Sequence, residues 1–135
     1  MHRKELAVQT KGRGFMELTK DVASVVRDSG VREGLCNVFL AHTSASLLVG
    51  ENWDESVRRD LEAFMSRLAP DGDPRYEHDV EGPDDMPAHI RTMLPQTSIV
   101  IPVGAGDLQL GRWQGIYLWE HRTTPHQRRV LVTVW

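Results

Sequence analysis

The chain has 135 residues and a mass of 15.3 kDa, and 40% of its residues are hydrophobic and 26% charged. That length suits a single domain, residues 1–135, and the composition excludes a disordered, collagen-like or coiled-coil protein. The net charge of −3 argues against nucleic acid as a partner, and no apolar run is long enough to cross a membrane. The one cysteine, Cys36, cannot form an intramolecular disulfide, which indicates a reducing, cytoplasmic location.

The first part of the chain predicts a strand, a helix and two more strands. Glu5–Thr10 suits a first strand, and Leu35–Ala41 and Ala45–Val49 suit the next two. Thr19 is the expected N-cap of the helix, and Gly30 is the expected stop. The helix is indicated by apolar residues at helical spacing: Leu18, Val22, Val25 and Val26.

The middle of the chain predicts two helices. The longer one carries a single apolar stripe: Trp53, Val57, Leu61, Phe64 and Leu68. Asn52 and Glu55 have the spacing of a capping box, and Pro70 marks the end of this helix. A shorter helix is expected over Pro87–Leu94.

The last third predicts hairpin-connected strands over Ser98–Val103, Leu108–Leu110, Gly115–His121 and Arg128–Trp135. Helices and strands alternate irregularly, so we expect an α+β fold with a largely antiparallel sheet and a few packed helices. The strands Ile99–Val103 and Val130–Trp135 are apolar on both faces, which predicts helices on one side and another sheet or subunit on the other. The pattern therefore indicates a homo-oligomer.

Residues 71–91 are strongly acidic, with seven carboxylates, two Arg and two His. This segment has a formal charge of −5, and the remaining chain has +2. One interpretation is a solvated loop. The other is a cation site, because His78, Asp84, Asp85 and His89 supply imidazole and carboxylate ligands within 12 residues.

Three of the six histidines lie at the ends of expected elements or in loops: His42, His78 and His89. Three protein ligands and an open position are typical of catalytic zinc. Their spacing matches no short metal motif, and each inward His has the alternative of a hydrogen bond within the core. The sequence leaves both interpretations open.

A second group of candidate residues lies on the strand Gly115–His121. Glu120 and Arg122 share one face, and His121 points to the other. Glu120 and Arg122 either pair with each other, or Arg122 binds a phosphate and Glu120 orients it or a water. Ser44 is expected to donate its hydroxyl to an anionic ligand, since no nucleophile elbow surrounds it.

Four segments spread over the whole chain resemble, in the same order, the YjbQ-like family, the secondary thiamine-phosphate synthases. They are His42-Thr43-Ser44-Ala45-Ser46, Glu51-Asn52, Gly82-Pro83-Asp84-Asp85-Met86-Pro87-Ala88-His89-Ile90, and the run from Leu110-Gly111 through Trp113-Gln114-Gly115-Ile116-Tyr117 to Glu120-His121-Arg122.

The resemblance implies a compact α+β fold that assembles as a homotrimer, with the site near subunit boundaries. It implies a secondary thiamine-phosphate synthase activity, in which a pyrimidine diphosphate and a thiazole phosphate are joined and pyrophosphate is released. It also implies a divalent metal, zinc or magnesium, bound by His42, His78 and His89.

Such a reaction needs positive charge at the departing diphosphate and little acid–base machinery. Arg122 and Ser44 are the expected partners of this phosphorylated small-molecule substrate. Asp84 and Asp85 either hold the ion or its waters, or they cap the helix. Trp113 stacks on the pyrimidine or belongs to the core.

Two other functions remain open for the same residues. They are a metal-dependent hydrolase of a small phosphorylated or acyl metabolite, and a non-catalytic protein that binds a metal or small molecule.

Overall fold

The computed structural model describes residues 1–135 and contains eight strands and three helices. The strands are β1 (His2–Gln9), β2 (Gly14–Glu17), β3 (Gly34–Leu40), β4 (Ala45–Glu51), β5 (Ser98–Gly104), β6 (Asp107–Leu108), β7 (Gln114–Glu120) and β8 (Gln127–Val134). The helices are α1 (Thr19–Ser29), α2 (Glu55–Leu68) and α3 (Asp85–Arg91). No helix is long and apolar enough to cross a membrane.

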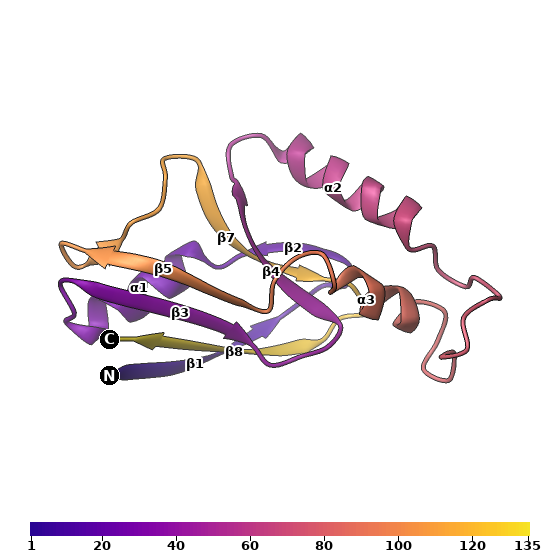
Figure 1. Cartoon of the computed structure of the whole chain (residues 1–135), viewed down its shortest axis with the longest axis horizontal. Coiled ribbons are helices and arrows are strands. Elements are labelled where there is room, and N and C mark those ends of the chain that lie inside the picture. Colours follow the sequence, from indigo (N-terminus) through magenta and orange to yellow (C-terminus); the bar gives the residue numbers. More distant parts are fainter.

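The strands form two antiparallel sheets. The larger sheet has the order β1-β8-β3-β5-β6, and the smaller one has the order β2-β7-β4. The first and last strands pair along their whole length, from His2 opposite Val134 to Gln9 opposite Gln127, so the two termini lie side by side (Figure 1). The expected single α+β domain with antiparallel sheets is confirmed.

The core lies between the two sheets and is closed by α1. The inward positions of β3, β5 and β8 alternate with outward ones, as a half-buried sheet requires. Val22, Val25 and Val26 of α1 are fully buried among them. Cys36 also faces this core, and burial raises the pKa of its thiol to about 11, which makes a reactive thiolate unfavourable.

Two helix starts differ from the sequence predictions. The N-cap of α2 is Asp54, which accepts a hydrogen bond from the Ser56 N–H at 2.9 Å, so the capping box of Asn52 and Glu55 is wrong. Thr19 is the first residue of α1, and its hydroxyl accepts a bond from the Ile116 N–H of β7. The predicted stop of α1 is confirmed, because Gly30 is in the left-handed conformation.

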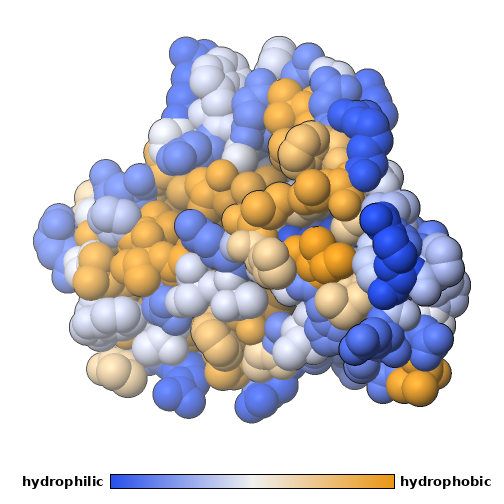
Figure 2. All heavy atoms as spheres, turned by 45° about the vertical axis from the view of Figure 1, so that its right-hand side comes forward, coloured by the Kyte–Doolittle hydropathy of each residue, from blue (hydrophilic) through white to orange (hydrophobic).

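Large apolar side chains stay exposed on two surfaces. The outer face of the larger sheet exposes Leu35, Phe39, Val100 and Trp135 by about 40–55%. The apolar stripe of α2 is also incompletely covered, since Trp53, Phe64 and Leu68 are at least half exposed. Figure 2 shows apolar side chains in a broad band across one side of the molecule.

Leu118 of β7 is fully buried between the sheets, so Leu118→Ala should lower the free energy of unfolding by about 2–5 kcal/mol. Urea unfolding followed by circular dichroism measures this change. Val80→Ala, at a side chain that is 86% exposed, should stay within about 0.5 kcal/mol of wild type. Equal losses in the two variants would contradict the assigned core.

Candidate functional site

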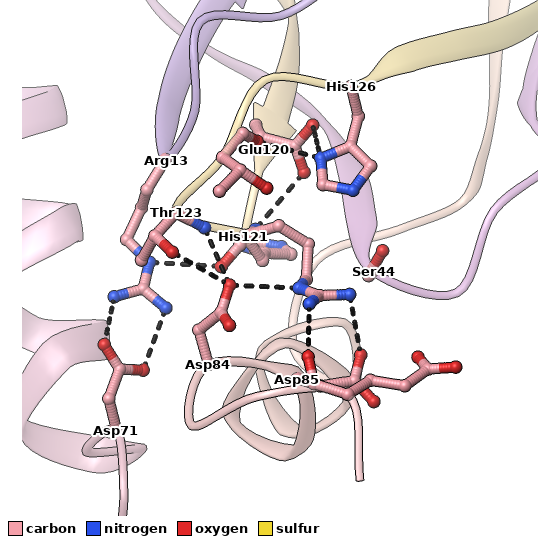
Figure 3. A network of polar contacts seen from close by, with 12 residues as sticks. Arg13, Ser44, Asp71, Asp84, Asp85, Glu120, His121, Thr123 and His126 are labelled. Carbon is pink, nitrogen blue, oxygen red and sulfur yellow. Dashed lines mark hydrogen bonds and ion pairs between the residues drawn. The ribbon is translucent and has the colours of Figure 1, made fainter.

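The candidate site lies where the start of α3 meets the end of β7. Asp84 and Asp85 lie side by side at the start of α3, below Glu120 at the end of β7 and the following His121 (Figure 3). α3 begins at Asp85, two residues before the predicted start. Residues 69–84 connect α2 to this point and bring His78 to the same place.

His78, Asp85 and His89 form a compact cluster of possible metal ligands. The Oδ2 atom of Asp85 is 2.8 Å from Nε2 of His78 and 3.5 Å from Nε2 of His89. One ligand atom from each residue lies within 4.8 Å of the other two. Asp85 and His89 are four residues apart on α3, so the helix itself places them on one face.

The donor set of this cluster fits a divalent ion. Two imidazole nitrogens and one carboxylate oxygen are the ligands of many catalytic zinc sites, which keep a further position open. The carboxylate of Asp85 is almost completely buried, whereas the imidazoles of His78 and His89 are partly exposed. An ion at the cluster would therefore remain reachable from solvent.

Arg122 holds the carboxylates of Asp84 and Asp85 in place, and these three residues are called the Arg122 clamp. Its Nε donates to Oδ2 of Asp84 at 3.0 Å, its Nη1 donates to Oδ1 of Asp85 at 3.1 Å, and its Nη2 donates to the Glu81 carbonyl at 2.9 Å. The bond to Oδ1 of Asp85 leaves Oδ2 directed at the two histidines. Arg122 thus orients a possible metal ligand, and all three of its nitrogens are occupied by protein acceptors.

Asp84 serves this clamp and does not cap α3. Its side chain makes no capping bond, and it accepts from the N–H and the hydroxyl of Thr123. Burial alone would raise the pKa of Asp84, but the bonds from Arg122 and Thr123 outweigh it and hold that pKa well below its usual range. Asp84 is therefore a carboxylate at neutral pH.

A second, fully buried ion pair lies beside the clamp. Glu120 accepts hydrogen bonds from Arg128, through Nε at 2.9 Å and through Nη2, and from the Thr10 hydroxyl at 2.7 Å. Burial raises the pKa of Glu120, but these bonds lower it below the ordinary value. The Arg122 side chain pairs with Asp84 and Asp85, so the predicted side-chain pairing of Glu120 with Arg122 is wrong.

His42 lies close to the cluster without belonging to it. Its Nε2 accepts a hydrogen bond from the Arg129 backbone N–H at 2.7 Å. His42 and His89 nevertheless line one cavity of about 540 Å³, together with Thr43 and the last residues of β3. The carboxylate of Asp85 therefore contacts both His78 and His89, whereas His42 lies across the cavity from His89.

His121 points away from the clamp, as its strand position predicts. The side chain is fully buried and makes a 2.9 Å hydrogen bond through Nε2 with the Ser46 hydroxyl. Burial, together with the charges of Arg91 and Arg13, lowers the pKa of His121 to about 3. The imidazole is therefore neutral and supports the fold beneath the site.

Trp113 is not a core residue, which corrects one of its two expected roles. Its side chain is 45% exposed, so it does not belong to the core. It packs edge-on against Trp53 with ring centroids 5.2 Å apart, and Arg112 lies over its ring. No residue of the His78 cluster takes part in this contact.

Sequence reasoning missed Arg128 and the role of Asp84. Arg128 is in phase with the buried Val130, Val132 and Val134 of β8, and a cation at an inward position of an apolar strand was the available signal. Nothing in the sequence around Asp84 indicates that it pairs with Arg122, because Arg122 is 38 residues away in the chain.

Comparison with known proteins agrees with this architecture. The family model described as UPF0047 protein YjbQ-like matches residues 4–135. The chain belongs to this YjbQ-like family. A UPF0047 protein of Synechocystis is 50% identical over 133 residues, covering 98% of this chain and 90% of the relative. The UPF0047 protein YjbQ of Escherichia coli O157:H7 is 45% identical, covering 98% of this chain and 96% of the relative.

Two solved structures of similar proteins have the same fold. An uncharacterised YjbQ/UPF0047 family protein of Clostridium acetobutylicum superposes with a TM-score of 0.86 at 34% identity and full coverage of both chains. A hypothetical protein of Aeropyrum pernix superposes with a TM-score of 0.90 at 28% identity, covering 100% of this chain and 98% of the other. The YjbQ-like fold thus extends over the whole chain.

The low pKa of His121 predicts a pH-dependent stability. The unfolded chain binds a proton at His121 near pH 6.5 and the folded chain does not, so the free energy of unfolding should fall by about 1.4 kcal/mol per pH unit below that value. Urea unfolding between pH 7 and 5 should show this slope in wild type and in Ser46→Ala, and a shallower slope in His121→Gln. Parallel curves for wild type and His121→Gln would contradict the neutral buried imidazole.

Proposed function

We propose that the protein is a metal-assisted transferase with secondary thiamine-phosphate synthase activity. In this reaction the bond between the pyrimidine methylene carbon and the diphosphate oxygen breaks, and its electron pair leaves with pyrophosphate. The thiazole nitrogen forms the new bond to that carbon. The reaction is the one that the resemblance of the segments around His42, Asp85 and Glu120 to the YjbQ-like family implies.

The proposed role of a metal in this reaction is supported by one observation, the convergence of His78, Asp85 and His89. A bound divalent ion, zinc or magnesium, would supply positive charge for the departing pyrophosphate. Two imidazole nitrogens favour zinc over magnesium, which prefers oxygen ligands. Arg122 keeps Oδ2 of Asp85 turned toward the histidines, so its contribution is to position a ligand.

The residues around the cluster suit a reaction without general acid–base chemistry. Asp84 and Glu120 are held as carboxylates by arginines, and buried His121 is held neutral. None of these three groups is poised to exchange a proton near pH 7. This agrees with a substitution driven by departure of a stable anion. The buried, unpaired Cys36 supports a reducing compartment such as the cytoplasm.

A pyrophosphate-release assay tests the proposal. Tag-free protein with zinc should release pyrophosphate only when both the pyrimidine diphosphate and the thiazole phosphate are present, and a chelator should stop the release. His89→Ala should lower the rate by at least about 100-fold, because it removes one of three metal ligands. His2→Ala, at the far end of the larger sheet, is the matched control and should keep the wild-type rate.

Other outcomes of this assay would contradict the transferase. Phosphate or pyrophosphate release with either substrate alone, still sensitive to chelator, would indicate the alternative hydrolase. No release under any condition, with a melting temperature lowered by chelator, would indicate a non-catalytic metal-binding protein.

We further propose that the protein assembles as a homotrimer through its exposed apolar surfaces. The outer face of the larger sheet exposes Phe39 and Val100, and the incompletely covered stripe of α2 offers a second apolar surface. Figure 2 shows a broad apolar band on one side of the molecule, and exposed apolar area of this kind is typical of an interface. Phe39 also lines the cavity next to His89, so such an interface would border the site.

Light scattering after size exclusion should give three times the 15.3 kDa mass of the chain. Val100→Asp should shift the mass toward the monomer, because it places a charge on the apolar face, and Val80→Asp should leave the trimer intact. A wild-type monomer at micromolar concentration would contradict the assembly.

A further inference from the structure

We propose that His42, Ser44 and Arg128 form an oxyanion-binding site beside the His78–Asp85–His89 cluster, and that this site takes a phosphate group of the substrate. Naming the ligand as substrate rests on the proposed function. The binding site itself rests on three side chains whose donors lack acceptors.

The first donor is Nδ1 of His42. A neutral imidazole carries one proton, and the other nitrogen can only accept. Nε2 of His42 accepts the Arg129 N–H at 2.7 Å, so the proton belongs on Nδ1. Burial and the charge of Arg128 both lower the pKa of His42, in agreement with a neutral ring. His42 therefore presents an N–H group at Nδ1.

The second donor is Nη1 of Arg128. This atom lies 3.5 Å from Nδ1 of His42, and the two groups face each other as donors. The rest of the guanidinium is satisfied, since Nε and Nη2 donate to Glu120 and Nη2 also donates to Ser44. The arginine side chain is 5% exposed, so water cannot freely replace a missing acceptor.

The third donor is the hydroxyl of Ser44. Its Oγ accepts from Nη2 of Arg128 at 2.9 Å, and the hydroxyl proton has no acceptor in the protein. Ser44 is only 8% exposed. Ser44 and His42 thus each lie against one terminal nitrogen of the Arg128 guanidinium, and the oxygens of one anion would supply the acceptors that these donors lack.

A cavity of about 540 Å³ opens beside His42 and is large enough for a phosphorylated small molecule. Its lining includes His42, Thr43 and the partly apolar end of β3, whereas Ser44 and Arg128 adjoin it through His42. The nearby Glu120 carboxylate is already paired with Arg128. His89 lines the same cavity and also belongs to the metal cluster. A phosphate held at His42 would therefore lie in the cavity that His89 also lines. This assigns phosphate binding to Arg128, whose Nη1 has no protein acceptor, in place of Arg122, each nitrogen of which makes a bond to residues 81–85.

Titration of metal-free protein with inorganic phosphate, followed by ³¹P NMR or calorimetry, tests the site without any organic substrate. We expect saturable binding in wild type, with phosphate favoured over acetate. Ser44→Ala and His42→Ala should each weaken binding about 10-fold, because each removes one hydrogen bond to a charged group. His2→Ala should bind phosphate as wild type does.

Arg128→Lys extends the test, since it keeps a cation beside the buried Glu120 and removes the free Nη1 donor. It should fold, as judged by circular dichroism, and bind phosphate at least about 10-fold more weakly. No phosphate binding in wild type, wild-type affinity in both Ser44→Ala and His42→Ala, or tighter binding of acetate than of phosphate would overturn the proposal. Because no metal or substrate is used, failure here is distinct from failure of the transferase.

Discussion

The bonds of Arg122 to residues 81–85 determine the geometry of the candidate site. One guanidinium reaches Asp84, Asp85 and the Glu81 carbonyl, and so ties the connection after α2 and the start of α3 to the end of β7. α3 has only seven residues and makes no side-chain cap at its start, so its own bonds are too few to fix its position. The orientation of Asp85 toward His78 and His89 follows from this attachment.

Pairing explains how such a small domain tolerates several buried charges. A carboxylate or guanidinium taken from water is stable only when an opposite charge and further hydrogen bonds replace its hydration. Asp84 with Arg122 and Glu120 with Arg128 meet that requirement, and Thr123 and Thr10 supply the remaining bonds. The free donor of Arg128 beside His42 and the convergence of His78, Asp85 and His89 are two places where an anion and a cation would complete the bonding.

The sequence predicted most of the elements but missed β2 (Gly14–Glu17), and it predicted the side-chain partners poorly. Apolar alternation located β5, β7 and β8 to within a residue or two, because burial imposes a period of two on each strand. Partners depend on which strand ends meet in space, and one sequence contains no information about that. His78, Asp85 and His89 were all candidates, but Asp85 joins the two histidines only because a distant arginine orients it. The sequence led us to expect a phosphate as the partner of Arg122, because its actual carboxylate partners lie 37 and 38 residues away in the chain.

The central claim is that His78, Asp85 and His89 hold a divalent ion. Its most direct test is the metal content of protein purified without a His-tag, loaded with zinc, dialysed and measured by mass spectrometry. The account predicts about one ion per chain in wild type and in His126→Ala, and loss of that ion in Asp85→Asn. Wild-type protein without bound metal, or Asp85→Asn protein with an undiminished content, would contradict it.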